Sequence, residues 1–250
     1  MAFLIVWALI LIIVSSIGEM LSPPATSAQP STLQQSNQTL PKTKSFQELC
    51  NQRNSLPTAT RNTIEVILTR INTNNCDTAG KQLNGLNILN LSDKDISDLS
   101  PLTTLPHLTQ IDLCHNKLRD ITPLASLVNL KQADLSYNRI TDIKPLAKLV
   151  NLTNLDLSYN EIADLRNLNN LINLRELDLS FNQINDVTPL AKLTMLTNLD
   201  LWGNLITDIK PLQNLTRLQK LSLTGNPLNL KICPIISKSV CVFDYETNNQ

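Results

Sequence analysis

One aspartate recurs every 22 residues in the middle of the chain, each time between two apolar residues. An apolar-Asp-apolar triplet is the alternation of a β-strand with one buried face, so the carboxylate points to the open face. If successive triplets pair, the carboxylates stand about 4.8 Å apart and repel one another by roughly 1 kcal/mol even in water. Such a ladder can receive a basic segment of a partner or bind Ca²⁺ weakly; alternatively, the aspartates belong to the scaffold alone. Its members are Asp112, Asp134, Asp156, Asp178 and Asp200.

Aromatic and polar residues accompany this ladder. Four of the nine aromatic residues (two Trp, three Tyr and four Phe) fall here, namely Tyr137, Tyr159, Phe181 and Trp202. Exposed aromatics are typical interface anchors, and the period-2 facing of a strand favours exposure of Trp202. The alternative for the Tyr and Phe residues is that they pack only against neighbouring turns. A polar column suited to hydrogen-bonding a peptide or a sugar stands at Gln110, Gln132, Asn154, Glu176 and Asn198.

Residues for catalysis are missing from the sequence. Cys114 beside His115 suggests a thiol nucleophile, but neighbouring strand residues point to opposite faces and no third orienting group is evident. There is no glycine-rich phosphate loop and no His/Cys metal spacing. We therefore expect no catalytic residue, no metal and no cofactor. The 21 basic and 21 acidic residues balance, which gives no indication of a nucleic-acid partner.

A repeating unit positions these side chains. It reads, for example, LTNLDLSYNEIADLRNLNNL, and its copies begin at Leu86, Leu108, Leu130, Leu152, Leu174, Leu196 and Leu218. The apolar first, fourth and sixth positions should point inward, and stacked copies should form a parallel sheet on a concave side. The second half, Asp-apolar-x-Pro-Leu, leaves room only for a short 3₁₀ turn on the convex side. A column of asparagines should satisfy backbone groups where each strand ends: Asn116, Asn138, Asn160, Asn182, Asn204 and Asn226.

The two ends of the array require covers. Residues 46–85 show helical spacing at Phe46, Leu49 and Cys50 and again around Ile64, which predicts a pair of helices tied by Cys50–Cys76. Such a cap hides the bare end of the first repeat; a separate helical binding domain is the alternative. Residues 229–250 are expected to form a C-terminal cap and tail with Cys233 bonded to Cys241. Paired cysteines indicate an oxidising compartment, with Cys114 left over.

The first 45 residues indicate export. Ala2 to Val14 is an unbroken apolar run, too short for a typical membrane span and suited to a signal peptide within residues 1–28. No Lys or Arg precedes Lys42, so an uncleaved membrane anchor remains the alternative. Residues 29–45 are polar and are predicted to be a disordered linker. We expect an exported protein, whether periplasmic, cell-surface or secreted, that meets a membrane only through this segment if it is uncleaved.

The spacing L-x-x-L-x-L-x-x-N is the leucine-rich repeat signature. From Leu86 to about Leu228 the 22-residue unit resembles the bacterial internalin-like subclass, which protein-phosphatase regulatory subunits share. The DLSYN and DLSFN cores with cysteine-bearing caps look most like short exported repeat proteins of cyanobacterial type. The front-cap disulfide departs from internalins. The resemblance implies a protein-binding scaffold without catalytic activity.

The expected fold is therefore an α/β leucine-rich-repeat horseshoe solenoid: a concave parallel sheet, convex 3₁₀ turns, a helical N-terminal cap and seven repeats over residues 86–228. The expected function is a monomeric, non-catalytic scaffold that binds a protein through its concave face. Alternatives are a surface adhesin that binds polysaccharide, with Trp202, Tyr137 and Tyr159 stacked on sugar rings, and a structural envelope protein. The predicted contact residues are the five aspartates, the four aromatics, Gln110 and Glu176.

Overall fold

The computed structural model describes residues 44–235 and 240–243. The expected signal peptide or anchor, and all but the last two residues of the expected linker, therefore lie outside the described residues. Among the described residues, no helix combines the length and apolarity that a membrane crossing requires.

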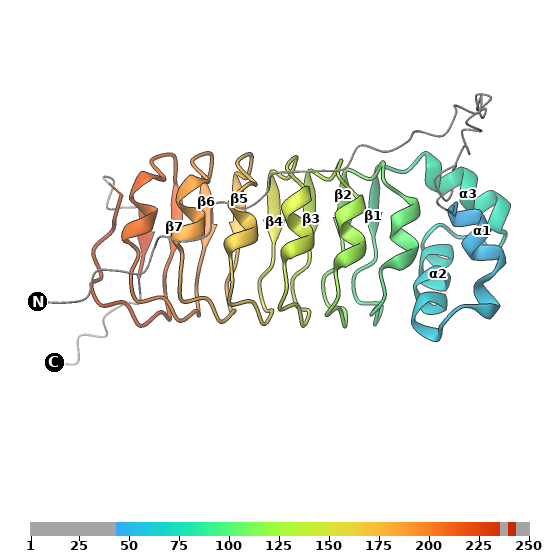
Figure 1. Cartoon of the computed structure of the whole chain (residues 1–250), viewed down its shortest axis with the longest axis horizontal. Coiled ribbons are helices and arrows are strands. Elements are labelled where there is room, and N and C mark those ends of the chain that lie inside the picture. Colours follow the sequence, from blue (N-terminus) through green and yellow to red (C-terminus); the bar gives the residue numbers. More distant parts are fainter. Residues whose placement is uncertain (1–43, 236–239, 244–250) are drawn as a thin grey trace, which may run out of the picture. The chain divides into compact units, whose positions relative to one another are not determined.

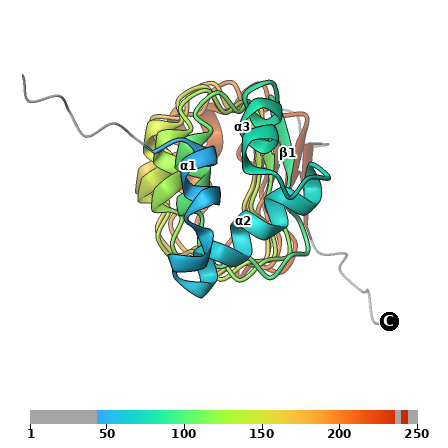
Figure 2. The same cartoon turned by 90° about the vertical axis from the view of Figure 1, so that its right-hand side faces the viewer.

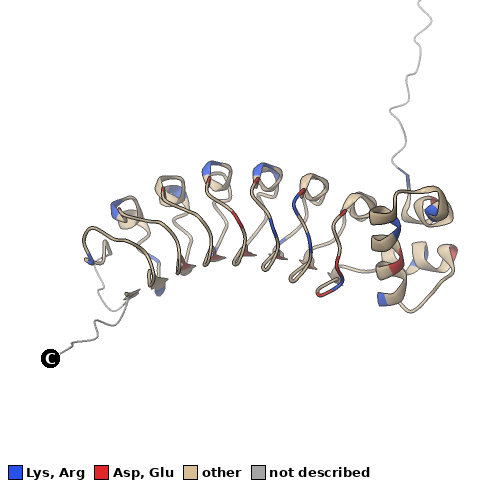
Figure 3. Ribbon diagram, turned by 90° about the horizontal axis from the view of Figure 1, so that it is seen from below, with Lys and Arg blue, Asp and Glu red and all other residues tan. Residues whose placement is uncertain are grey.

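One parallel sheet runs through the whole array (Figure 1). Its strands pair in chain order, and each residue lies beside the residue 22 positions further on, as Ile111 does beside Ala133. The array curves with the strands on the inner side and the turns on the outer side (Figure 3), which confirms the expected fold class. The strands are β1 (Ile88–Asn90), β2 (Gln110–Asp112), β3 (Gln132–Asp134), β4 (Asn154–Asp156), β5 (Glu176–Asp178), β6 (Asn198–Asp200), β7 (Lys220–Ser222) and β8 (Cys241–Val242).

The core is a set of leucine and isoleucine columns. In the fourth repeat, Leu152, Leu155 and Leu157 are buried on the side of the strand that faces the core. Ile162 and Leu165, which follow the strand, are also buried in the core. The same positions are buried in the neighbouring repeats, so each repeat buries its apolar residues against the next one. A single copy has no partner for these surfaces, which is why the array is needed for stability.

Short 3₁₀ helices occupy the convex side, as the Asp-apolar-x-Pro-Leu segment predicts. Before each one, an aspartate Oδ1 accepts the backbone N–H two residues on, as Asp120 does from Thr122 at 2.8 Å. Hydrogen bonding from the side chain of Thr122, and then from its backbone N–H, lowers the pKa of the Asp120 carboxyl. On the convex side of the described repeats, the 3₁₀ helix that shortens to three residues contains Asn167, which stands where the other five helices have proline. The helices are η2 (Ser100–Thr104), η3 (Thr122–Ser126), η4 (Lys144–Lys148), η5 (Arg166–Leu168), η6 (Thr188–Lys192) and η7 (Lys210–Asn214).

A column of buried asparagines links consecutive repeats. Asn160 Nδ2 donates to the carbonyl oxygens of Leu135, Leu157 and Ser158 at 3.0, 3.0 and 3.1 Å. Its Oδ1 accepts the backbone N–H of Ile140 at 3.0 Å. One side chain thereby satisfies four backbone groups in two repeats. The equivalent asparagines in the neighbouring copies make the same bonds.

The N-terminal cap contains three α-helices, so the prediction of a helix pair was wrong. They are α1 (Phe46–Asn51), α2 (Thr58–Arg70) and α3 (Cys76–Asn84), with the 3₁₀ helix η1 (Arg53–Ser55) between the first two. Helix α3 starts at the Asn75 cap and buries Cys76, Ala79 and Leu83, a stripe too weak in large apolar residues to stand out in the sequence. Its Cys76 sulfur bonds to Cys50 of α1 at 1.97 Å.

At the other end of the array, the described residues close with a second disulfide. The sulfur atoms of Cys233 and Cys241 are bonded at 2.01 Å, and Cys241 lies in the short strand β8. Strand β8 pairs with β7 through Leu221 and Ser222. The remainder of the expected C-terminal cap and tail, residues 236–239 and 244–250, lies outside the described residues.

We predict that Asn160→Ala lowers the free energy of unfolding by about 3 kcal/mol or more, because each buried group left without a partner costs roughly 1–3 kcal/mol. The matched control is Asn173→Ala, since the Asn173 amide donates to only one carbonyl, that of Val150, at an exposed site. That change should cost less than about 1 kcal/mol. Urea denaturation followed by circular dichroism measures both values, and equal losses would contradict the role of the asparagine column.

Candidate functional site

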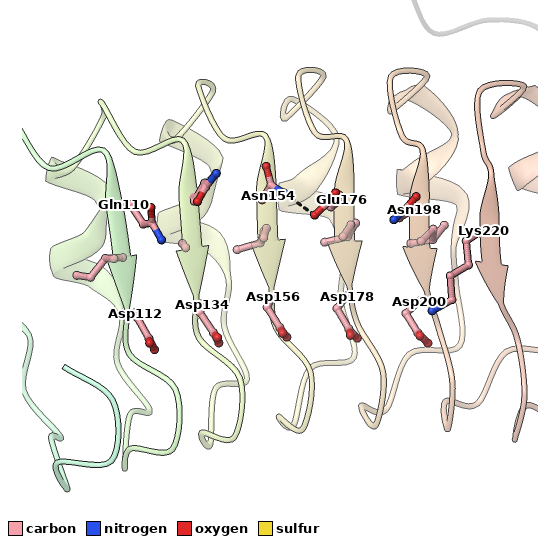
Figure 4. A pocket seen from close by; sticks show the side chains of 16 residues that line it. Gln110, Asp112, Asp134, Asn154, Asp156, Glu176, Asp178, Asn198, Asp200 and Lys220 are labelled. Atoms are coloured by element: carbon pink, nitrogen blue, oxygen red, sulfur yellow. Dashed lines mark hydrogen bonds between the residues drawn. The ribbon is translucent and has the colours of Figure 1, made fainter. Parts of the chain in front are cut away.

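A groove on the concave face, of about 430 Å³, is lined by residues of six neighbouring strands. Its lining includes the side chains at the third and fifth positions of the second to sixth repeats. These positions lie in β2 to β6 and face outward, and Lys220 of β7 also lines the groove (Figure 4). The third position contributes Gln110, Gln132, Asn154, Glu176 and Asn198. The fifth contributes Asp112, Asp134, Asp156, Asp178 and Asp200. The period-2 alternation thus places the predicted aspartates and polar column on one surface.

Each aspartate of the groove also ends its own strand. Asp134 Oδ1 accepts the Ser136 backbone N–H at 3.0 Å and the Ser136 hydroxyl at 2.6 Å. The other four aspartates accept the N–H two residues on in the same way. In Asp134, Asp156, Asp178 and Asp200 the second oxygen accepts no hydrogen bond within the described residues. One oxygen therefore serves the scaffold, and the other is available to a ligand.

The electrostatics of the groove favour a cationic ligand. Burial raises the pKa of the Asp156 carboxyl, and the carboxylates of Asp178 and Asp134 raise it further. Burial likewise raises the pKa of Asp178, where Asp200 adds to the shift and Lys220 opposes it. Lys220 is the one basic residue in the lining. Ionised carboxylates in this groove are therefore held near one another at an energetic cost that a bound cation would reduce.

The polar column beside the aspartates is connected rather than isolated. Asn154 Nδ2 donates to Glu176 Oε2 at 2.5 Å, which joins β4 to β5 across the groove floor (Figure 4). Thr153 Oγ1 donates to Asn154 Oδ1 at 2.8 Å. A ligand that approaches this part of the groove meets a paired amide and carboxylate, so the geometry at Glu176 is fixed before binding.

The predicted aromatic residues do not line the groove. Tyr137, Tyr159 and Phe181 stand at the eighth position of their repeats, past the end of the strand, where the backbone φ is 54°, 53° and 52°. Tyr137 and Tyr159 stack with ring centroids 4.1 Å apart, and Tyr159 and Phe181 at 4.3 Å. His115, at the same position of the second repeat, stacks on Tyr137 at 4.0 Å. The rings thus form a separate ladder beyond the strand ends, and a role of these rings in binding a partner stays a prediction.

Trp202 extends this ladder from a different position. It stands at the seventh position of the sixth repeat, and its ring lies 4.7 Å from that of Phe181 at an interplanar angle of 58°. The eighth position there is Gly203, and in the next repeat Gly225, both with positive φ. A Cβ at Gly225 would lie 3.2 Å from the indole ring. Gly225 therefore leaves the space that the Trp202 ring occupies, whereas a Cβ at Gly203 would lie 3.0 Å from the Phe181 ring.

His115 is the member of the ladder that sequence reasoning missed. Its signal was available, because His115 occupies the same place in its repeat as Tyr137 and Tyr159. Beside Cys114, however, His115 suggests a catalytic partner of the thiol rather than a member of an aromatic ladder. The Cys114 thiol has its pKa raised to about 12, by burial first and then by Asp112, so it is a poor nucleophile. Possible ligand atoms of Asp112, Cys114 and Asp134 lie within 4.8 Å of one another.

Stacked single-strand units with an open concave face define a solenoid repeat protein. Residues 84–126, 128–170, 150–192 and 194–237 match the family described as leucine-rich repeats in two copies. The chain belongs to the leucine-rich repeat family. No curated protein matches it significantly.

Solved structures show the same fold. The chain is 32% identical in sequence to internalin C2 from Listeria monocytogenes, and its structure matches the crystal structure of that protein with a TM-score of 0.63. The match covers 72% of this chain and 90% of that one. A leucine-rich repeat protein of Leptospira interrogans is 25% identical, with a TM-score of 0.51, over 67% of this chain and 50% of that one. These matches confirm the internalin-like subclass. The likeness to cyanobacterial repeat proteins stays a prediction.

We predict that Asp156→Asn together with Asp178→Asn raises the free energy of unfolding at pH 7 by up to about 1 kcal/mol, the order of like-charge repulsion on strands. Burial raises the pKa of both carboxyls, so the folded state binds protons more tightly than the unfolded state. Their contribution to stability therefore falls as pH rises through the raised pKa values. The gain in free energy of unfolding from the two Asp→Asn changes should shrink as the pH falls towards the pKa of an aspartate in the unfolded chain, about 4.

The control for this prediction is Asp164→Asn on the convex side. Hydrogen bonds from Arg166 lower the pKa of Asp164, so its carboxylate stabilises the fold at pH 7 and loses that effect as pH falls through the lowered value. At pH 7 the Asp156/Asp178 double variant should be more stable than the parent protein, and the Asp164→Asn variant should be less stable. Denaturation series at several pH values measure both differences. A loss of stability at pH 7 in the Asp156/Asp178 double variant would contradict the prediction.

Proposed function

We propose that this protein is a non-catalytic scaffold that binds another protein in the concave groove of its repeat array. The leucine-rich repeat fold is typical of protein-interaction scaffolds. The observation that carries the proposal is the row of carboxylates in the groove, each with one oxygen engaged in its own strand. Like charges at this spacing destabilise the sheet, and a partner that neutralises them offsets that cost.

The proposed partner presents a basic segment to the groove. Its Lys or Arg side chains would meet the free oxygens of Asp134, Asp156 and Asp178, where buried carboxylates bind cations more strongly than exposed ones do. Glu176 and Gln110 would contact the flanking residues of the segment. The protein would act as a monomer, with the groove open along the sheet.

A polysaccharide ligand is the second candidate, and the ring geometry limits it. Sugars stack on free aromatic faces, but the faces of Tyr137 and Tyr159 are covered by neighbouring rings. Trp202, with 44% of its surface exposed, is the remaining candidate platform among the four predicted aromatics. A stacked row can also serve the scaffold alone, by stabilising backbone turns with positive φ. A purely structural role in the cell envelope is the third candidate.

Export is part of the proposal. Two cysteine pairs close the ends of the array, and disulfides of this kind persist in oxidising compartments. The protein would therefore work outside the cytoplasm, in the periplasm, at the cell surface or as a secreted protein. The apolar start of the chain would direct it there.

Binding is tested by capturing proteins from the source organism on the immobilised full chain and identifying them by mass spectrometry. A groove partner should be lost with the double change Asp156→Asn and Asp178→Asn and should weaken as salt rises. The matched control, Asp164→Asn with Asp186→Asn, removes two carboxylates from the convex side and should leave capture unchanged. A ligand that responds only to Trp202→Ala would favour the polysaccharide candidate. Retention of every partner by all the variants would contradict the groove proposal.

Export is tested by fractionating the source cells and counting thiols in the unfolded, unreduced chain. Of the five cysteines, one should react with a maleimide in denaturant, namely Cys114. In the folded chain Cys114 should react slowly at pH 7, because its pKa is raised to about 12. Five reactive thiols in protein isolated without a reducing agent would contradict both disulfides and the exported location.

A further inference from the structure

Among the described residues, no strand pairs with the outer edge of β1, the first strand of the sheet. On either side of β1, backbone groups of Asn87, Leu91 and Asp93 bond to the segment that contains β2. Backbone groups alternate in direction along a strand, so those of Ile88 and Asn90 point away from β2. Strand β1 is terminal in the sheet, and within the described residues no backbone hydrogen bond reaches this edge. Up to four backbone groups are thus available to a further strand.

A hollow lies next to this edge. It measures about 430 Å³ and is lined by Arg70 and Ile71 at the end of α2, Gln82 of α3, and Leu86, Ile88 and Leu89. Figure 2 shows the end of α2 and helix α3 on the side of the cap where β1 lies, with α1 on the opposite side. The Ile88 side chain is 58% exposed, which is unusual for a large apolar residue in a strand. The cap thus covers the core of the first repeat but leaves an apolar surface beside the strand edge.

The charge of the hollow is opposite to that of the groove. Arg70 is its one charged lining residue and forms no ion pair with any described residue. An unpaired guanidinium beside apolar side chains favours a carboxylate with apolar neighbours. The concave groove, lined by Asp and Glu, selects against such a ligand.

We propose that the outer edge of β1 binds an extended peptide segment of a partner protein, with an acidic side chain between apolar ones. The segment adds a strand beside β1 and bonds to the backbone of Ile88 and Asn90, as in β-strand addition at an exposed sheet edge. Its apolar side chains contact Ile88 and Leu86, and its carboxylate pairs with Arg70. This site is distinct from the groove and does not depend on what the groove binds.

The test is an NMR titration of the full chain with the acetylated, amidated heptapeptide Ser-Thr-Val-Glu-Val-Thr-Ser. The amide signals of Ile88 and Asn90 should shift and become protected from hydrogen exchange. Arg70→Glu should weaken binding by at least about threefold, the order of a lost charge-assisted contact. Lys81→Glu, the same reversal on α3 outside the hollow, should leave the affinity unchanged. N-methylation of both valines should abolish binding, because it removes peptide donors without altering the protein.

Three results would overturn the proposal: no shift at Ile88 and Asn90, shifts confined to the amides of Asp112 to Asp200, or equal binding of the peptide with Lys in place of Glu. Protection of the Ile88 and Asn90 amides before any peptide is added would also overturn it. That result would assign the edge to the chain's own residues 1–43 if it is independent of concentration, and to a second copy if it is not.

Discussion

The asparagine column is the interaction on which the rest of this structure depends. Where each strand ends, buried carbonyl and N–H groups of two repeats need partners, and one amide side chain supplies four bonds. A chain without such a residue would leave these groups unsatisfied at a cost of roughly 1–3 kcal/mol each. Because the amide joins a repeat to its neighbours, it also fixes the register. Once the register is fixed, every other position of the unit becomes a column on a known surface.

This dependence explains which features could be predicted from the sequence. Leucine columns, strands and 3₁₀ turns follow from positions that repeat without variation. The groove aspartates follow from strand alternation, which holds at Asp156. It fails three residues later at Tyr159, because the backbone there has left the strand and turned to positive φ. The 22-residue period places His115, Tyr137 and Tyr159 at one repeat position, but it carries no sign of the positive φ that directs their rings. Helix α3 was missed because its buried face is mostly small residues, Cys76 and Ala79.

The aspartate ladder combines a scaffold role with the binding role proposed above, two roles that sequence reasoning treats as alternatives. One oxygen of Asp134 accepts the N–H and hydroxyl of Ser136, a bond that ends the strand and belongs to the scaffold. The same geometry directs the second oxygen into the groove. Burial then raises the pKa of Asp156 and Asp178, so the scaffold itself creates the unfavourable charge that a ligand can neutralise. Scaffold and binding surface are thus supplied by one side chain.

The constant pairing of each residue with the one 22 positions further on has an evolutionary consequence. Unequal recombination between two copies removes or adds a whole unit and joins equivalent positions, so the asparagine column and the core remain continuous. The groove then becomes shorter or longer by one carboxylate without any new packing problem. The two disulfide-bonded ends are untouched by such events. The binding surface can therefore change in length by a single genetic step, whereas its caps can change only residue by residue.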